Sequence, residues 1–126
     1  MTFILQWVMS SLVLDQLRTV CMALPEATER LSHGEPCWFV AKGRCSASFN
    51  DHHHDDRVSV WLAAPTGIQE VLMSNQPEKF FRPPYVGVKG WIGVYLNIPT
   101  DWDEVAELVL ESYRCVAKPK YLAMLE

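Results

Sequence analysis

The feature that most constrains the fold is a run of short apolar segments with no helical segment between them. The segments are CWFVA (37–41), CSASF (45–49) and RVSVWLA (57–63). Short runs rich in β-branched and aromatic residues, separated by turn residues, are typical of consecutive strands. Because the strands come in a run rather than alternating with helices, we expect an α+β fold, with helices packed on one face of an antiparallel sheet.

The expected strands have two different faces, because successive strand residues point to opposite sides of a sheet. Pairing of Ala41 with Arg44 across a tight Lys42-Gly43 turn predicts one buried stripe on the first hairpin. Its expected members are Trp38, Val40, Cys45, Ala47 and Phe49. In the third segment the apolar residues alternate with Ser59 and Trp61, which predicts a half-buried strand.

Helical periodicity predicts three helices around these strands. The first covers about residues 11–24 and ends at Pro25, because proline cannot continue the hydrogen-bond ladder. The second follows Pro65, and Thr66 and Gln69 have the spacing of a capping box at its start. Its expected apolar face consists of Ile68, Val71 and Leu72.

The last third of the chain is expected to form one or two strands and then the third helix. GWIGVYL (90–96) has the pattern of a strand. The third helix is expected over residues 100–117, with Asp101 and Asp103 in its first turn, where carboxylates interact favourably with the helix dipole. The regularly spaced Glu104, Glu107 and Glu111 are interpreted as a solvated face rather than as paired catalytic carboxylates.

Composition limits the class of protein. A chain of 126 residues suits one domain, and 49% apolar with 21% charged residues is ordinary for a soluble globular protein. The formal charge of −4 argues against a dedicated nucleic-acid binder, which usually has a strong basic excess. A local basic patch is compatible with this balance.

The N-terminal segment 1–14 is apolar but is interrupted by polar residues. It falls short of the ~20 apolar residues that a membrane-spanning helix needs, and it lacks the leader and cleavage site of a secretory signal. We therefore expect no membrane association. Residues 1–12 are interpreted as an extension that packs on the core or on a partner subunit, 13–122 as the domain and 123–126 as a tail.

The four cysteines, Cys21, Cys37, Cys45 and Cys115, include no C-x-x-C pair. The hairpin register above places Cys37 opposite Ser48 and Cys45 opposite Val40. The two sulfurs would then be roughly 10 Å apart along the strand, which is too far for a disulfide. We expect four reduced thiols in a cytoplasmic protein.

The stretch NDHHHDD (50–56) raises the question of a metal site. Its weak candidate ligands are His52, His54 and Asp55, with Asp56 as a further possibility. Three adjacent histidines cannot converge on one ion, and a structural zinc site needs four ligands, with no second cluster in the sequence. We therefore interpret the stretch as a solvated hairpin turn without a native metal.

The sequence contains none of the common motifs for a phosphate-binding loop, a dinucleotide fold, a serine nucleophile or a zinc protease. We therefore assign no catalytic residue and no cofactor, and we expect a binding domain more readily than an enzyme. The most unusual stretch is FFRPPYVGVKGWIGVYL (80–96). Its aromatic and basic residues could stack on bases and hold phosphates, or its aromatic residues could fill the core.

The same residues carry a family resemblance. The matching segments are ALPEATE (23–29), HGEP (33–36), HHHDDRVSVW (52–61), PEKFFRPPYVGVKGWIGVYL (77–96), DWDEV (101–105) and SYRCVAKPKYL (112–122). In these segments the chain resembles the MmcQ/YjbR family of small bacterial proteins. The resemblance implies a compact α+β fold similar to CyaY and a double-wing mode of DNA binding, and it implies no shared catalytic residues.

Two classes of function follow. The leading hypothesis is a non-enzymatic binding domain with weak affinity for DNA, as a monomer or a homodimer. Its expected DNA contacts are Lys42 and Arg44 on one hairpin and Arg82 and Lys89 on a second loop. The alternative is a small-molecule or metal-dependent activity in a groove beside the 52–56 hairpin. The groove is expected to be lined by His53, Tyr85 and Trp91.

Overall fold

The helices and strands are those of an α+β protein with one central sheet. The computed structural model describes residues 3–51 and 57–125. The elements in chain order are α1 (Phe3–Met22), β1 (Ala27–Ser32), β2 (Glu35–Val40), β3 (Cys45–Asp51), β4 (Val58–Leu62), α2 (Ile68–Asn75), β5 (Phe80–Phe81), the 3-10 helix η1 (Val86–Lys89), β6 (Ile92–Tyr95), α3 (Trp102–Val116), α4 (Pro119–Leu122) and the 3-10 helix η2 (Ala123–Leu125).

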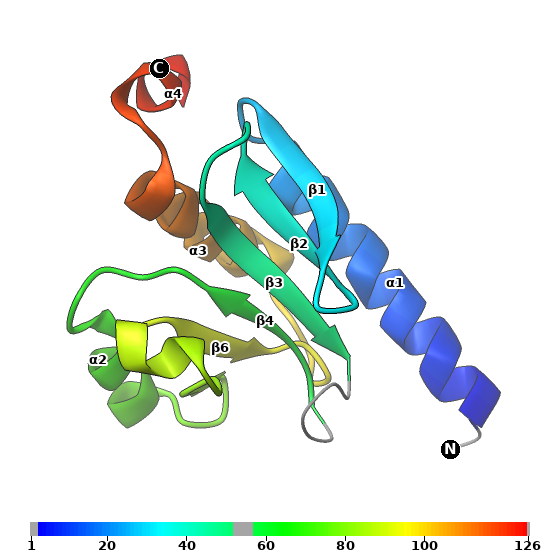
Figure 1. The fold of residues 1–126 in the computed structure, drawn as a ribbon. Coiled ribbons are helices and arrows are strands. Elements are labelled where there is room, and N and C mark those ends of the chain that lie inside the picture. Colours follow the sequence, from blue (N-terminus) through cyan, green and yellow to red (C-terminus); the bar gives the residue numbers. More distant parts are fainter. Residues whose placement is uncertain (1–2, 52–56, 126) are drawn as a thin grey trace.

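The six strands pair antiparallel in the order β1-β2-β3-β4-β6-β5 (Figure 1). The first four strands are neighbours in sequence and in space. The chain then forms α2 and β5 before β6 returns to pair with β4. This arrangement confirms the expected α+β fold with an antiparallel sheet.

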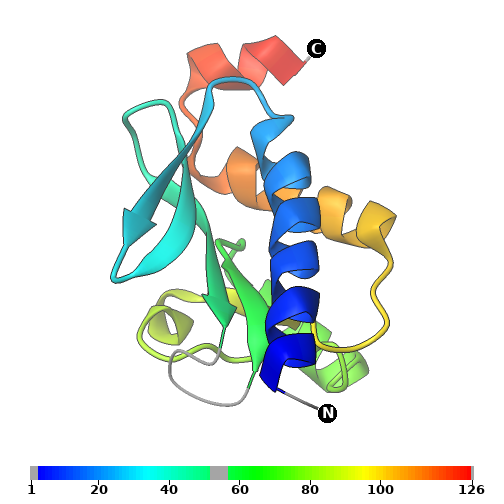
Figure 2. The same ribbon diagram turned by 90° about the vertical axis from the view of Figure 1, so that its right-hand side faces the viewer.

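Helices α1 and α3 cover one face of the sheet, whereas η1 lies on the opposite side (Figure 1, Figure 2). The helix-covered face contains the main core, in which alternate strand residues contact Leu17 of α1 and Val105 and Val109 of α3. Trp38 of β2, which is 1% exposed, is the largest of the fully buried side chains. The face that carries η1, here called the open face, is therefore the one available for a site.

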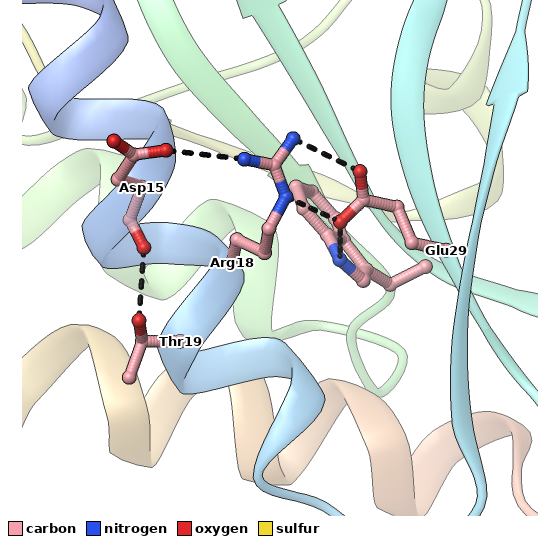
Figure 3. Close-up of polar contacts among 5 residues, drawn as sticks. Asp15, Arg18, Thr19 and Glu29 are labelled. Carbon is pink, nitrogen blue, oxygen red and sulfur yellow. Dashed lines mark hydrogen bonds and ion pairs between the residues drawn. The ribbon is translucent and has the colours of Figure 1, made fainter.

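An ion pair joins α1 to the sheet (Figure 3). Arg18 donates from Nε and Nη2 to the two carboxylate oxygens of Glu29 on β1, at 2.8 and 3.0 Å. The indole nitrogen of Trp38, opposite Glu29 on β2, donates to the same carboxylate at 3.0 Å. The hydrogen bond to Glu29 raises the pKa of Arg18 above its usual value. One carboxylate thus fixes the position of α1 and orients the central core residue.

The first helix is longer than its expected span. It begins at Phe3 instead of near residue 11, because the polar residues in the apolar N-terminal segment do not interrupt a helix. The N-terminal half of α1 leaves Ile4, Trp7 and Leu12 exposed. No helix in the described part of the chain is long and apolar enough to cross a membrane.

Two strands also differ from expectation. Strand β1 was not predicted from the sequence, because this edge strand, ATERLS, is mostly polar and has no alternating apolar pattern. Strand β4 was expected to be half-buried, but every one of its residues is buried. Trp61, on the side away from α1 and α3, is covered there as well, which shows that part of the open face is also enclosed.

Replacing Glu29 with Ala should lower the free energy of unfolding by about 2–3 kcal/mol, because the buried Trp38 indole loses this acceptor. Arg18 is 39% exposed at its side chain, so its ion pair contributes a smaller part. The matched variant Asp15→Ala removes the more exposed partner of Arg18 and should change stability by about 0–0.5 kcal/mol. Urea denaturation of both variants tests this, and equal losses would contradict it.

Candidate functional site

The open face of the sheet contains a cavity of about 490 Å³. Its floor consists of the strand residues Cys37, Cys45, Ser48, Asn50 and Trp61. One wall is the β1–β2 turn with Ser32, His33 and Glu35, and the opposite wall is the segment 82–91 with Tyr85, Val86, Lys89 and Trp91. We call this space the open-face cavity and the segment 82–91 the cap loop.

The strand register explains how the floor is built. Cys37 pairs with Ser48, Ser48 with Trp61, and Trp61 with Gly93, so these residues form one row across four strands. Partners in a row point to the same face of a sheet. The row places a thiol, a hydroxyl and an indole side by side on the open face.

A β-bulge brings the second thiol to the same floor. The register shifts between Trp38 and Phe39, so that Cys45 pairs with Phe39 instead of with Val40. Cys45 therefore shares the open face with Cys37, and its expected place in the buried stripe with Trp38 is wrong. The expected separation of roughly 10 Å is also wrong, because the shifted register makes Cys37 and Cys45 diagonal neighbours on the cavity floor, close enough for each thiol to change the pKa of the other. All four cysteines are free thiols.

The contact between the two thiols shifts their pKa values in opposite directions. The hydrogen bond from Cys45 lowers the pKa of Cys37 to about 6, against the opposing effect of burial. The Ser48 and Ser32 hydroxyls and the charge of His33 lower it further. The same hydrogen bond and burial raise the pKa of Cys45 far above its usual value. Cys37 is thus the thiol of the pair that ionises first.

The cap loop is tied to the rest of the molecule by Gln69. The side-chain amide of this residue, which is 7% exposed, donates to the carbonyls of Gly87 at 2.9 Å and Trp91 at 2.6 Å. The capping box that we expected from Gln69 is wrong, because α2 begins after Gly67 and has no side-chain cap. Its expected apolar face is also only partly buried, since Ile68 and Val71 are exposed. Gln69 is the buried residue of α2 instead.

Tyr85 lies at the mouth of the cavity with 73% of its surface exposed. Its φ of 62° is in the left-handed region, which is uncommon for any residue other than glycine. Such strained conformations often accompany ligand sites, where surrounding contacts maintain them. The conformation starts the turn of η1 and positions the tyrosine at the mouth.

The structure brings together only some of the residues expected from the sequence. Tyr85, Trp91 and Lys89 all line the open-face cavity. Arg82 is at the start of the cap loop, and its aliphatic part lies against Gly87. The candidates of the 52–56 turn lie outside the described residues; they are His52, His53, His54, Asp55 and Asp56.

The other two basic candidates form a separate group. Lys42 and Arg44 line a smaller hollow together with Lys118 and Tyr121 from the region that follows α3. Both are exposed. The positive charge of Arg44 is near enough to Cys115 in α3 to lower the pKa of that thiol, against the larger effects that raise it. Within the described residues, no three His, Cys, Asp or Glu side chains are grouped as a metal site requires.

A larger hollow of about 610 Å³ lies between the N-terminal half of α1 and the segment before α3. Its described lining includes Met9, Val13, Ile98 and Trp102 and contains no charged or thiol group. We regard the smaller open-face cavity as the better candidate, because it combines aromatic walls with polar and nucleophilic groups.

Several cavity residues were missed by sequence reasoning. His33, Cys37 and Cys45 were not connected with Tyr85 and Trp91, because a β-bulge and a long-range loop bring them together. Trp61 could have been recognised as a site residue from the sequence, because a large aromatic side chain stands at a position where the alternation of the strand predicts a polar residue. Gln69 gave none, because its partners lie 18 and 22 residues away.

Comparison with known proteins identifies the family. The YjbR family model matches residues 22–115, about three quarters of the chain. The chain belongs to the YjbR family. The match confirms the resemblance noted in the sequence, and it includes the whole lining of the open-face cavity.

The YjbR fold is also found among solved structures. The crystal structure of the Deinococcus radiodurans protein DR2400, with the domain DUF419, is similar with a TM-score of 0.66. The two chains are 22% identical, and the similarity covers 79% of this chain and 75% of the other. At this identity the likeness shows the fold alone. No curated protein matches the chain.

Replacing Gln69 with Glu tests the attachment of the cap loop in this YjbR domain. A carboxylate cannot donate to the Gly87 and Trp91 carbonyls, so the free energy of unfolding should fall by about 3 kcal/mol at pH 7. The loss should shrink at lower pH, because a protonated carboxyl donates one hydrogen bond. Amide hydrogen exchange should accelerate in residues 86–91. The control Gln16→Glu, at an exposed position on α1, should change neither measurement.

Proposed function

We propose that this YjbR domain is a binding protein whose open-face cavity takes a small planar molecule with a polar edge. The observation that carries the proposal is the cavity of about 490 Å³ with Trp61, Tyr85 and Trp91 in its lining. This size is within the range of small-molecule sites, which are mostly apolar and have a few polar groups.

The lining suits such a molecule because its aromatic and polar groups come from different elements. Trp91 and Tyr85 belong to the cap loop and Trp61 to the floor, so a bound flat ring would meet aromatic side chains from two different elements. Ser48 and Asn50 on the floor offer hydrogen bonds to its polar edge. Lys89 adds a positive charge in one wall and His33 offers a ring N–H in the opposite wall, which favours a polar edge that carries a negative charge.

A fluorescent aromatic sulfonate, 8-anilinonaphthalene-1-sulfonate, is a suitable probe because it combines flat rings with an anionic group. Its titration into the folded protein should give a fluorescence increase with one-site saturation. Tyr85→Ala should weaken binding about fivefold or more, since the exposed ring contributes about 1 kcal/mol of stacking at the mouth. Met9→Ala, in the larger apolar hollow, is the matched control and should leave the affinity unchanged.

The opposite pattern, with binding lost in Met9→Ala and retained in Tyr85→Ala, would assign the probe to the other hollow and contradict the proposal. Both variants change side chains that are exposed, so loss of folding is not expected. Thermal denaturation of each variant checks this point directly.

A second candidate function is weak binding to DNA, and the observation that favours it is the basic group at the β2–β3 turn. Lys42 and Arg44 lie with Lys118 around a hollow that also contains Tyr121. Lys120 lies over the Tyr121 ring at 5.0 Å. Cations interleaved with an aromatic side chain suit phosphates and stacked bases. Arg82 and Lys89 would add contacts from the cap loop.

Binding to duplex DNA should then be electrostatic and insensitive to sequence. If Lys42, Arg44, Arg82 and Lys89 are the direct phosphate contacts, they neutralise about four phosphates, which predicts a slope of log affinity against log salt of roughly −3 to −4. The double variants Lys42→Ala/Arg44→Ala and Arg82→Ala/Lys89→Ala should each make the slope shallower by about two units. Absence of salt-dependent binding at ~20 mM salt, where screening is weak, would exclude this candidate.

A further inference from the structure

Two of the four thiols meet inside the open-face cavity, and nothing in the proposed binding of a planar molecule uses them. Cys37 on β2 and Cys45 on β3 are diagonal neighbours on the floor, because the bulge moves Cys45 opposite Phe39. Cys37 is buried, whereas Cys45 is half-buried, and both contribute to the surface of the cavity. A small molecule that enters the cavity therefore meets a pair of thiols.

The surroundings favour the ionised form of one member of the pair. Cys37 has the Cys45 thiol, the Ser48 hydroxyl and His33 around it, and these lower its pKa against the effect of burial. Lys89 brings a further positive charge to the opposite wall of the cavity. Although Cys37 is buried, it lines the cavity, and a thiol that borders a cavity in a positively charged environment can react there, because the thiolate is the nucleophile.

The remaining two cysteines lack these features. Cys21 lies in the core between α1 and the sheet, where burial and the charge of Glu29 raise its pKa to about 12. Cys115 is exposed on α3, but burial of its sulfur and the charge of Glu111 raise its pKa as well. Exposure alone would favour reaction at Cys115, so the two criteria of access and ionisation point to different residues.

We propose that Cys37 and Cys45 form a dithiol site that exchanges with small disulfides in the open-face cavity. Cys37 is the attacking thiol, and Cys45 is the resolving thiol. The proposal rests on the proposed function only in that a small molecule must reach the cavity floor. It does not require a planar molecule or stacking on the tryptophans.

The exchange takes place in two steps. The Cys37 thiolate attacks one sulfur of the small disulfide, whose S–S bond breaks, so that a mixed disulfide forms and one small thiolate leaves and takes a proton from water. Cys45 then loses its proton and attacks the Cys37 sulfur, which releases the second small thiol. Two protein thiols are oxidised to one disulfide, and one small disulfide is reduced to two thiols.

Cystamine is the probe, because it is a small disulfide and reacts without a cofactor. The fully reduced protein is treated at pH 7 under native conditions, quenched with acid and mapped by mass spectrometry. The expected product is a Cys37–Cys45 disulfide with Cys21 and Cys115 still reduced. The rate should rise with a midpoint below pH 8, because Cys37 ionises before an ordinary thiol.

Three variants assign the roles. Cys45→Ser should stop the reaction at one cysteamine adduct on Cys37, since no resolving thiol remains. Cys37→Ser should react at least about tenfold more slowly, because burial still raises the pKa of the remaining cavity thiol, Cys45, and keeps it protonated. Cys115→Ser is the matched control and should form the same cross-link at an unchanged rate.

A first adduct on Cys115 with Cys37 and Cys45 unreacted would overturn the proposal, and so would a rate that rises only above pH 8. The map of the unsubstituted protein decides this even where a cysteine variant does not fold. Titration of the same preparation with the aromatic sulfonate separates the two ideas. If the protein binds the sulfonate but forms no cross-link, the proposed binding function is supported and the proposed dithiol site is contradicted.

Discussion

The side-chain amide of Gln69 is the contact on which the open-face cavity depends. The cap loop has two prolines and two glycines and makes its own backbone hydrogen bonds mainly within short turns. A single amide group from α2 donates to the carbonyls of Gly87 and Trp91, in the middle and at the end of the cap loop. The flanking strands β5 and β6 fix the two ends of the loop, and the Gln69 amide fixes the stretch between them that forms a wall of the cavity. The position of a helix at the sheet edge thereby sets the shape of a site on the sheet face.

Much of the architecture follows from the sequence because periodicity encodes which face of a strand or helix is buried. The alternation of Val58, Val60 and Leu62 with Trp61 placed the indole on the correct side of β4. The bulge at Phe39 could not be anticipated in the same way, since one extra residue in a ladder leaves no mark in a pattern of period two. That shift moved Cys45 across the sheet and turned two apparently distant thiols into neighbours.

Gln69 illustrates a second limit of sequence reasoning. Its position three residues after Thr66 is the same in a capping box and in the observed structure, so local spacing cannot separate the two. Only the tertiary position of the cap loop decides which carbonyls the amide reaches. The basic residues show the same limit, because Lys42 and Arg44 lie beside Lys118, far away in the sequence, and only the fold reveals that group. Site residues that are brought together by long-range contacts cannot be recognised from local sequence spacing.

The strand order has a consequence for the newly made chain. Strands β1 to β4 are successive neighbours, so the pairing that aligns Cys37 with Cys45 needs only local hairpins, which form quickly. The cap loop cannot take its place beside the floor until α2 and Trp91 have been synthesised. At ribosomal rates of roughly 5 to 20 residues per second, the 46 residues from Cys45 to Trp91 take about 2 to 9 seconds. Cys37 and Cys45 are therefore synthesised in every molecule before the segment that completes the walls of their cavity exists.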